Sequence, residues 1–278
     1  MSRARWQIKH RTAYTYGAPA RDSFNDARLK PVSNARQTAE SFCLTTTPAA
    51  AFHEYQDFYG NWIHHFEIPS LHSSLVIESQ SVVEAHPPAP LPEDAATVPL
   101  AGMPELVKSS DYFDYLGGSR LVTVEPEIWR LALDATSGLS DTWQAAQALL
   151  RFTHGCLEYS PASTGVHTPL REALAKKRGV CQDFAHLMLG LCRALKIPAS
   201  YVSGYLAVEK ARATHAWVEV WIPTAGWLAL DPTHNRQIDH TYIKIGNGRD
   251  YSDVPPVTGS YRGTVKHTME IDVQIDAI

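Results

Sequence analysis

The sequence predicts an α+β fold, in which helices pack on an antiparallel sheet, preceded by an all-β N-terminal domain. The spacing of apolar residues has a period of two in the first part of the chain, 3.6 in the middle, and two again towards the end. Helices and strands that occur in separate blocks are typical of α+β rather than doubly wound folds. We expect a β-rich domain over residues 1–86, a proline-rich linker over residues 87–99 and a second domain over residues 100–278.

The first block contains two strand patterns followed by a break. In residues 62–68 apolar and polar positions alternate after the turn sequence Tyr59-Gly60-Asn61, and residues 75–83 are rich in β-branched side chains. The next segment reads AHPPAPLPEDAATVP, where proline removes backbone donors and fixes φ. Neither a helix nor a central strand is compatible with that composition, so the domain boundary is placed there.

The second domain begins with helices. Pro126 between two glutamates predicts a helix start, and Asp141 precedes a helical stripe formed by Trp143, Ala146 and Leu150. From about residue 199 the period returns to two. Residues 216–221 and 227–230 are predicted to be an antiparallel pair joined by a short turn, and a strictly alternating strand over residues 265–275 is expected to close this domain.

Composition excludes several classes of protein. The chain has 278 residues, a net charge of -4, 44% hydrophobic and 19% charged residues, which are typical of a globular protein and give no reason to expect nucleic acid or a membrane surface as partner. Thirteen histidines are scattered without a HExxH cluster. The four cysteines show no CxxC spacing, and the N-terminus lacks the apolar run of a secretory signal. We therefore expect free thiols, no transmembrane helix and a cytoplasmic protein.

Cys181 has the sequence context of a reactive thiol. Gly179 ends the preceding helix, and a new apolar stripe consists of Phe184, Leu187, Leu191 and Leu195. Cys181 is thus expected in the first turn of that helix, where unpaired N–H groups and the helix dipole favour a thiolate. Cys192 falls in the helix interior and is interpreted as a core residue.

His215 and Asp231 supply the other groups that thiol chemistry requires. Taken alone, His215 at the start of a strand could be a core histidine, and Asp231 before a proline could be part of a turn. Together with Cys181 they offer a nucleophile, a base that takes its proton, and a carboxylate that orients the base. A zinc site built from the same three residues lacks a fourth ligand at a recognisable spacing.

The sequence resembles the transglutaminase-like superfamily in four successive motifs, which are GVCQDFAHL, KIPASYVSGYL, HAWVEVW and GWLALDPTHN. This superfamily includes animal transglutaminases, peptide N-glycanases and many bacterial candidate cysteine proteases, and residues 150–235 match it best. The resemblance implies a papain/transglutaminase-like core with Cys181, His215 and Asp231 as catalytic triad. The flanking stretches WQIKHRTAYTY and DFYGNWIHHFEI, together with residues 246–263, resemble the bacterial two-part form with a β-rich N-terminal domain.

The sequence departs from the animal enzymes in two respects. These use a tryptophan upstream of the cysteine to stabilise the oxyanion, whereas Trp143 lies in a predicted helical core stripe. Tyr159 and Gln182 are the candidate oxyanion or substrate-binding side chains, although Tyr159 could simply pack its ring, and the backbone N–H of Cys181 is the expected main donor. Calcium-binding loops are not visible, so we expect no metal and no other cofactor.

The resemblance implies acyl transfer at an amide, either a peptide bond or a glutamine side chain, through a thioester on Cys181. A peptide or protein is the expected substrate, and its identity is left open, as is the oligomeric state. Hydrolysis is favoured over cross-linking, because intracellular cross-linking would be a hazard unless it were gated. The alternative function is a catalytically silent scaffold or binding module. For a working site, we expect the Cys181 sulfur within about 4 Å of one His215 ring nitrogen and Asp231 facing the other.

Overall fold

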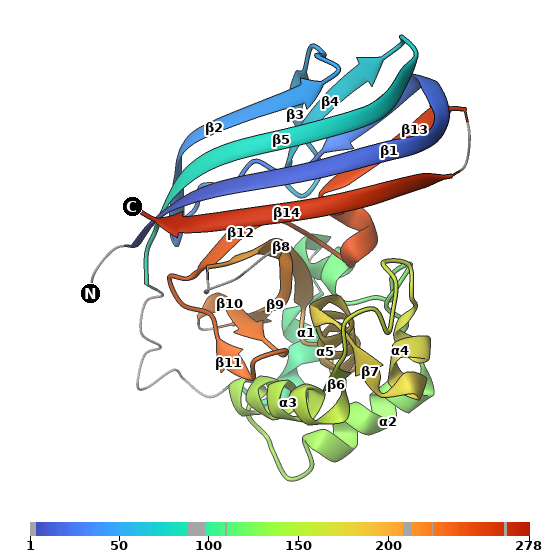
Figure 1. Ribbon diagram of the computed structural model, residues 1–278. Helices are drawn as coiled ribbons and strands as arrows, with labels where there is room; N and C mark the ends of the chain where they lie inside the picture. Colours follow the sequence, from blue (N-terminus) through green and yellow to red (C-terminus); the bar gives the residue numbers. More distant parts are fainter. Residues whose placement is uncertain (1–3, 88–97, 109, 208–212, 224, 264–265) are drawn as a thin grey trace.

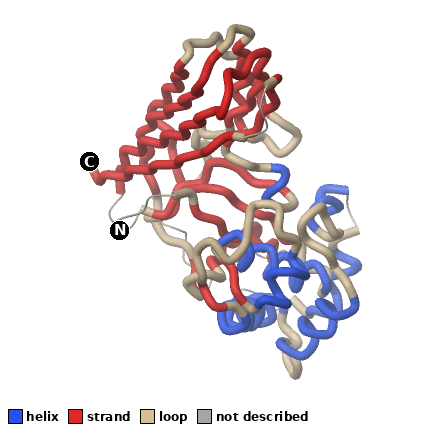
Figure 2. Tube along the Cα trace, turned by 45° about the vertical axis from the view of Figure 1, so that its right-hand side comes forward, coloured by secondary structure: helices blue, strands red, loops and turns tan. Residues whose placement is uncertain are grey.

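The computed structural model describes residues 4–87, 98–108, 110–207, 213–223, 225–263 and 266–278. It consists of a large sheet of long strands that lies across a mixed body of helices and a smaller sheet (Figures 1 and 2). Among the described residues, no helix has the length and apolar character needed to cross a membrane.

The large sheet is built on one long strand, β1 (Ala4–Ala27). It has the order β2-β5-β1-β4-β3, and β13 and β14 also pair with β1. The first half of β1 pairs with β5 and β14, and its second half pairs with β4 and β13 beyond a register shift between Thr15 and Ala20. The other strands of this sheet are β2 (Gln37–Thr47), β3 (His53–Gln56), β4 (Trp62–Ile68), β5 (His72–Ala85), β13 (Val257–Arg262) and β14 (His267–Ala277).

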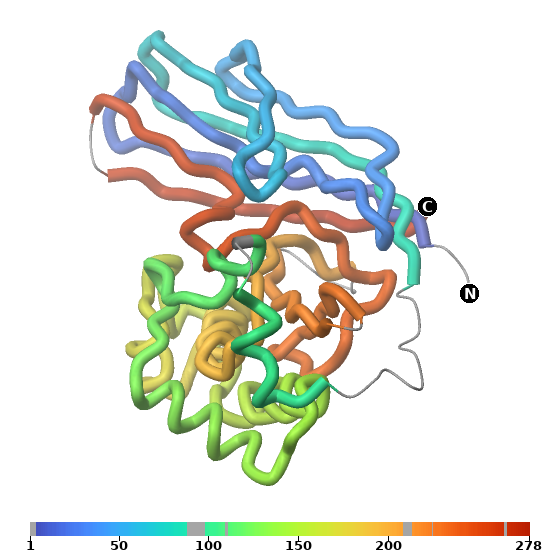
Figure 3. Tube along the Cα trace, turned by 180° about the vertical axis from the view of Figure 1, so that it is seen from behind, coloured from blue at the N-terminus to red at the C-terminus, as the bar shows by residue number. Residues whose placement is uncertain are grey.

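The C-terminal strand lies in this sheet, not in the second domain. β14 pairs antiparallel with β1 from Trp6↔Ala277 to Tyr16↔His267, so the expectation that it closes the second domain is wrong. Figure 3 shows the last strand beside the first along most of its length. A period of two fixes which face a strand buries, but it does not say which strand lies beside it. Val265, the first residue of the predicted strand, lies outside the described residues.

The second sheet is antiparallel, with the order β11-β10-β9-β8-β12. The predicted hairpin is confirmed, since Trp227 pairs with Trp221 and Leu230 pairs with Val218. The strands are β8 (Ala199–Leu206), β9 (His215–Ile222), β10 (Gly226–Asp231), β11 (Arg236–Gln237) and β12 (Tyr242–Gly248); a separate parallel pair consists of β6 (Glu158–Tyr159) and β7 (Arg178–Gly179).

The helices pack with the five-stranded sheet to form the second body of the molecule (Figure 1). The predicted starts are confirmed: α2 begins at Pro126, and the Asp141 carboxylate caps α3 by accepting from the Gln144 N–H at 2.9 Å. The helices are α1 (Met103–Leu106), α2 (Pro126–Ala135), α3 (Thr142–Cys156), α4 (Leu170–Lys176) and α5 (Cys181–Ala194), and three short 3₁₀ segments are η1 (Leu100–Gly102), η2 (Ser110–Tyr115) and η3 (Tyr251–Asp253).

α5 is the central element of the core. It packs on β8 and β9, and α2, α3 and α4 cover its other sides. The predicted apolar stripe is buried, and Cys192 is fully buried within it, as expected. A separate apolar cluster that includes Ile8 and Val273 from the large sheet and Tyr205 and Ile243 from the small one joins the two bodies. Burial on every face fixes the direction of α5, and therefore the position of its first residue.

Candidate active site

The position of Cys181 is fixed by Asp183, whose side chain folds back over the start of α5 and contacts the residues just before the helix. The Asp183 carboxylate accepts hydrogen bonds from the Val180 N–H at 2.8 Å and from the Thr164 hydroxyl at 2.6 Å. A Cβ on Gly179 would lie only 2.5 Å from the Asp183 Cβ, so the fold-back requires glycine at this position. Cys181 is therefore the first residue of α5, as predicted, and it is half-buried at the helix end where the dipole favours an anion.

The β9–β10 hairpin brings His215 and Asp231 together. Leu230 pairs with Val218, so continuing the ladder by one residue sets Asp231 opposite Trp217. His215 is two residues from Trp217 and shares its face of the sheet, which makes it a diagonal neighbour of Asp231. The His215 Nε2 and the Asp231 Oδ2 are 2.8 Å apart. The register that the sequence suggested is thus the one that joins these two side chains.

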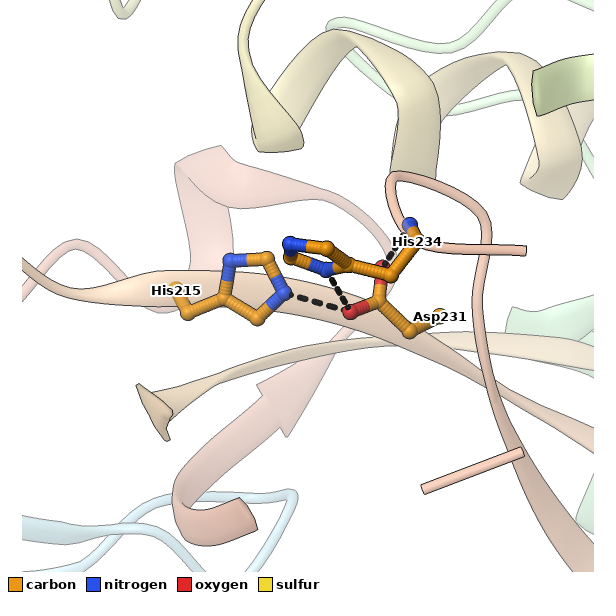
Figure 4. A group of neighbouring side chains, drawn as sticks. All are labelled: His215, Asp231 and His234. Atoms are coloured by element: carbon orange, nitrogen blue, oxygen red, sulfur yellow. Dashed lines mark hydrogen bonds and ion pairs between the residues drawn. The ribbon is translucent and has the colours of Figure 1, made fainter. Parts of the chain in front are cut away.

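The Asp231 carboxylate is fully buried and accepts hydrogen bonds at both oxygens. Its Oδ2 accepts from His215 Nε2, from His234 Nδ1 at 2.7 Å and from the Tyr242 hydroxyl at 2.7 Å (Figure 4 shows the two rings). Its Oδ1 accepts from the N–H of Thr233 at 2.8 Å. Burial disfavours the charged carboxylate, but the hydrogen bonds outweigh it and hold the pKa of Asp231 well below its usual value.

The His215 ring lies between Asp231 and Cys181. Because Nε2 faces Asp231, Nδ1 is the nitrogen left for Cys181, whose side chain interacts with the same ring and lines one cavity with it. Burial opposes protonation of His215, but the interactions with Asp231 and Cys181 outweigh it and raise its pKa to about 9. A protonated imidazole at neutral pH stabilises a thiolate on its other side.

This raised pKa predicts an alkaline limit to activity. Since the pKa of His215 moves from 6.5 up to about 9, the imidazolium and the stability it adds are fully present below about pH 6.5 and are lost as the pH rises through about 9. The ring carbon shift of His215, assigned by His215→Asn, should therefore titrate near pH 9 in an NMR experiment. A midpoint at or below 6.5 would contradict this assignment.

Cys181 and His215 lie in the wall of a cavity of about 290 Å³. Tyr159 and Gln182 line the same cavity, so the structure brings both sequence-predicted side chains to the site. The Tyr159 ring is 55% exposed and its centroid lies 6.4 Å from that of Phe184, while the Gln182 amide donates to the Val166 carbonyl at 3.1 Å. The Gln182 amide has a second N–H available for an oxyanion, and the roles of both residues stay predictions.

Two functional candidates were missed by the sequence reasoning. His234 belongs to the quoted motif DPTHN, and its spacing of three residues after Asp231 was a signal that could have been used. Tyr242 comes from β12, which follows Asp231 by eleven residues, and no sequence pattern linked the two. Both donate to the oxygen that also serves His215, so both compete with it for the same negative charge.

Two histidines and a carboxylate are side chains that can bind a metal ion. Among the described residues, His215, Asp231 and His234 bring such ligand atoms within 4.8 Å of one another. Here both rings are engaged with the shared carboxylate, and a metal would have to replace these hydrogen bonds. The geometry therefore fits an oriented base better than a metal centre.

The shared carboxylate makes His234 a modulator of His215. Removing its donor with His234→Ala should leave more of the Asp231 charge to His215, raise the pKa of that ring above about 9, and change kcat by less than about tenfold. NMR titration of His215 measures the shift, and His53→Ala, an exposed histidine of β3, is the control. A His215 midpoint that stays in place would show that His234 does not act on the pair.

Two protein-family models match this chain, one in each of its two parts. The model of the transglutaminase-like superfamily matches residues 130–232, and that of the bacterial transglutaminase-like N-terminal region matches residues 6–84. An uncharacterized protein of Mycobacterium leprae is 35% identical over 98% of each chain. A protein-glutamine gamma-glutamyltransferase of Pseudomonas aeruginosa is 36% identical over 32% of this chain and 15% of its own.

A solved structure shows the same fold. A candidate cysteine protease from Cytophaga hutchinsonii superposes with a TM-score of 0.83 at 21% identity, covering 100% of this chain and 92% of its own. The common fold therefore includes both the β-rich N-terminal part and the helical core.

Proposed function

Because this chain belongs to the transglutaminase-like superfamily, we propose that it is a cysteine-dependent enzyme that acts on amides of a peptide or protein. Cys181 is the nucleophile, His215 the general base and acid, and Asp231 the carboxylate that orients the ring. The observation that carries the proposal is the position of the His215 ring, between the Cys181 thiol and the buried Asp231 carboxylate.

The acylation step uses these groups in order. The Cys181 sulfur attacks the carbonyl carbon of the amide, and a tetrahedral oxyanion forms. The first N–H groups of α5, including that of Cys181, lack partners within the helix and stabilise this charge, with the Gln182 amide as a second donor. The His215 imidazolium then gives its proton to the leaving nitrogen, the C–N bond breaks, and an acyl thioester and an amine result.

The deacylation step returns the site to its starting state. Neutral His215 takes a proton from water, the hydroxide adds to the thioester carbonyl, and the C–S bond breaks to release a carboxylic acid and the Cys181 thiolate. An amine in place of water would give a new amide instead. Asp231 keeps Nε2 protonated throughout, so that Nδ1 is the nitrogen that exchanges the proton.

Water is the acceptor in this proposal. An ungated cross-linking enzyme would join proteins of the cell that makes it, which favours hydrolysis. The Pseudomonas aeruginosa relative carries the name of a glutamyl transferase and shares about a third of this chain.

Two measurements test the proposal. The rate of alkylation by iodoacetamide at pH 7 should be at least about tenfold higher for Cys181 than for glutathione, because the adjacent imidazolium favours the thiolate. Incubation of dimethylated casein with excess labelled amine in ¹⁸O-water should place more ¹⁸O than amine in the products. Alkylation at the rate of a free thiol would instead indicate a silent scaffold, and predominant amine incorporation would indicate transfer.

A further inference from the structure

A second cavity adjoins the one that contains Cys181. It has a volume of about 400 Å³, and five residues line both: Tyr14, Val166, Tyr251, Val257 and Met269. Because these side chains are common to the two cavities, the cavities lie side by side, and together they are called the cleft. Their volumes offer more room than a single side chain would occupy, as a site for an extended segment requires.

One wall of this cleft comes from the large N-terminal sheet. β1 and β14 pair with the register Thr12↔Ile271, Tyr14↔Met269 and Tyr16↔His267, and directly paired residues share a face. Members of each of these pairs line the cleft. Further along the same ladder, His10↔Val273 and Ile8↔Ile275 lead into the apolar cluster that joins the two bodies. One face of the sheet thus packs against the second body near Ile8 and Val273 and lines the cleft further along the same strands.

The apolar side chains of β14 become exposed beyond the apolar cluster that joins the sheet to the second body. Val273 is 1% exposed, whereas Ile271 is 42% and Met269 is 51% exposed. Adjacent exposed apolar residues in a concave site are a mark of ligand binding. The tyrosines 14, 16, 251 and 261 add aromatic surface around them.

The charge of the cleft is one-sided. Its described lining includes Arg120, His167 and His267 in the second cavity, and no aspartate or glutamate in either cavity. Arg120 is exposed and has no ion-pair partner among the residues that the structure describes. A cation without an ion-pair partner among the described residues, in the lining of an apolar cleft, is complementary to a carboxylate.

We infer that this cleft is a substrate groove for a polypeptide segment that has an apolar side chain near the reacting amide and a carboxylate further along, bound by Arg120. The inference rests on the proposed function, because the groove matters only if Cys181 reacts there. It assigns to the N-terminal sheet, through Met269 and Ile271 of β14, a direct role in choosing the substrate.

Protection of Cys181 tests the groove without a known substrate. Two pools of eight-residue peptides would share a central glutamine and neighbouring Phe and Leu, and would carry either Glu or Lys on both sides, so that the direction of binding need not be known. The measured quantity is the initial rate of Cys181 alkylation by iodoacetamide against peptide concentration. The Glu pool should protect at about fivefold lower concentration than the Lys pool, and the difference should shrink at high salt.

Three variants separate charge from contact. Arg120→Glu should remove or reverse the preference for the Glu pool, while Arg130→Glu, an exposed arginine of α2 outside the cleft, makes the same change in net charge and should keep it. Met269→Asn, which removes the apolar contact without changing the charge, should weaken protection by both pools about tenfold. Circular dichroism would verify that each variant is folded.

The outcomes distinguish the two proposals. Fast alkylation of Cys181 with equal protection by both pools, or with no protection, would overturn the groove and leave the proposed function standing. A preference that survives Arg120→Glu would also overturn it. Alkylation no faster than that of glutathione would overturn the proposed function itself.

Discussion

Replacing Cys181 with alanine is expected to lower kcat by at least about 10⁴-fold and to leave the protein folded, because the thioester cannot form without the sulfur. Cys181 is half-buried at the start of α5, and the fold-back of Asp183 that positions it does not involve the thiol. Hydrolysis of dimethylated casein and the circular dichroism spectrum are the measurements.

Cys192→Ala is the matched control for this variant. Cys192 is fully buried in α5, eleven residues further on, so its loss should lower the free energy of unfolding by about 1 kcal/mol and leave the activity of the folded protein unchanged. Full activity in Cys181→Ala, or loss of activity in folded Cys192→Ala, would show that Cys181 is not the nucleophile.

Asp231→Asn is expected to lower kcat by about 10² to 10⁴-fold. An amide at this position can present an N–H to His215, which would move the ring proton to Nδ1, the nitrogen that must accept a proton from Cys181. Loss of the negative charge should also shift the pKa of His215 down from about 9. The pH dependence of kcat/KM should therefore lose activity at a lower pH than in the parent enzyme.

The stability of this variant gives an independent readout. The parent carboxylate has a lowered pKa, so its contribution to stability is present above about pH 4 and is lost as the pH falls. Asp231→Asn should remove that acid dependence and lower the free energy of unfolding at pH 7 by about 1 to 3 kcal/mol, because buried donors lose a charged acceptor. Asp134→Asn, which changes an exposed carboxylate of α2, is the control. Unchanged kcat in the folded variant would mean that Asp231 is structural only.

Much of the candidate site was predictable because its signals are local in the chain. A cysteine at a helix start, a histidine that opens a strand and an aspartate that ends the next one depend on periodicity and short-range turn geometry. The hairpin register then follows from the short connection between the two strands, and it makes His215 and Asp231 diagonal neighbours. The Gly179–Asp183 contact that fixes Cys181 is also local, and a motif of five residues contains it.

Tertiary structure alone decided which distant segments share the site. Tyr242 reaches Asp231 through the sheet, and β14 pairs with β1 across more than 250 residues of sequence. Alternation of apolar residues identifies a strand and its two faces, whereas its neighbour is chosen by packing over the whole molecule. The order of strands and helices and the three candidate groups can be predicted from local patterns. That the C-terminal strand walls the cleft follows from β-pairing and burial, which are set by contacts between segments far apart in the chain.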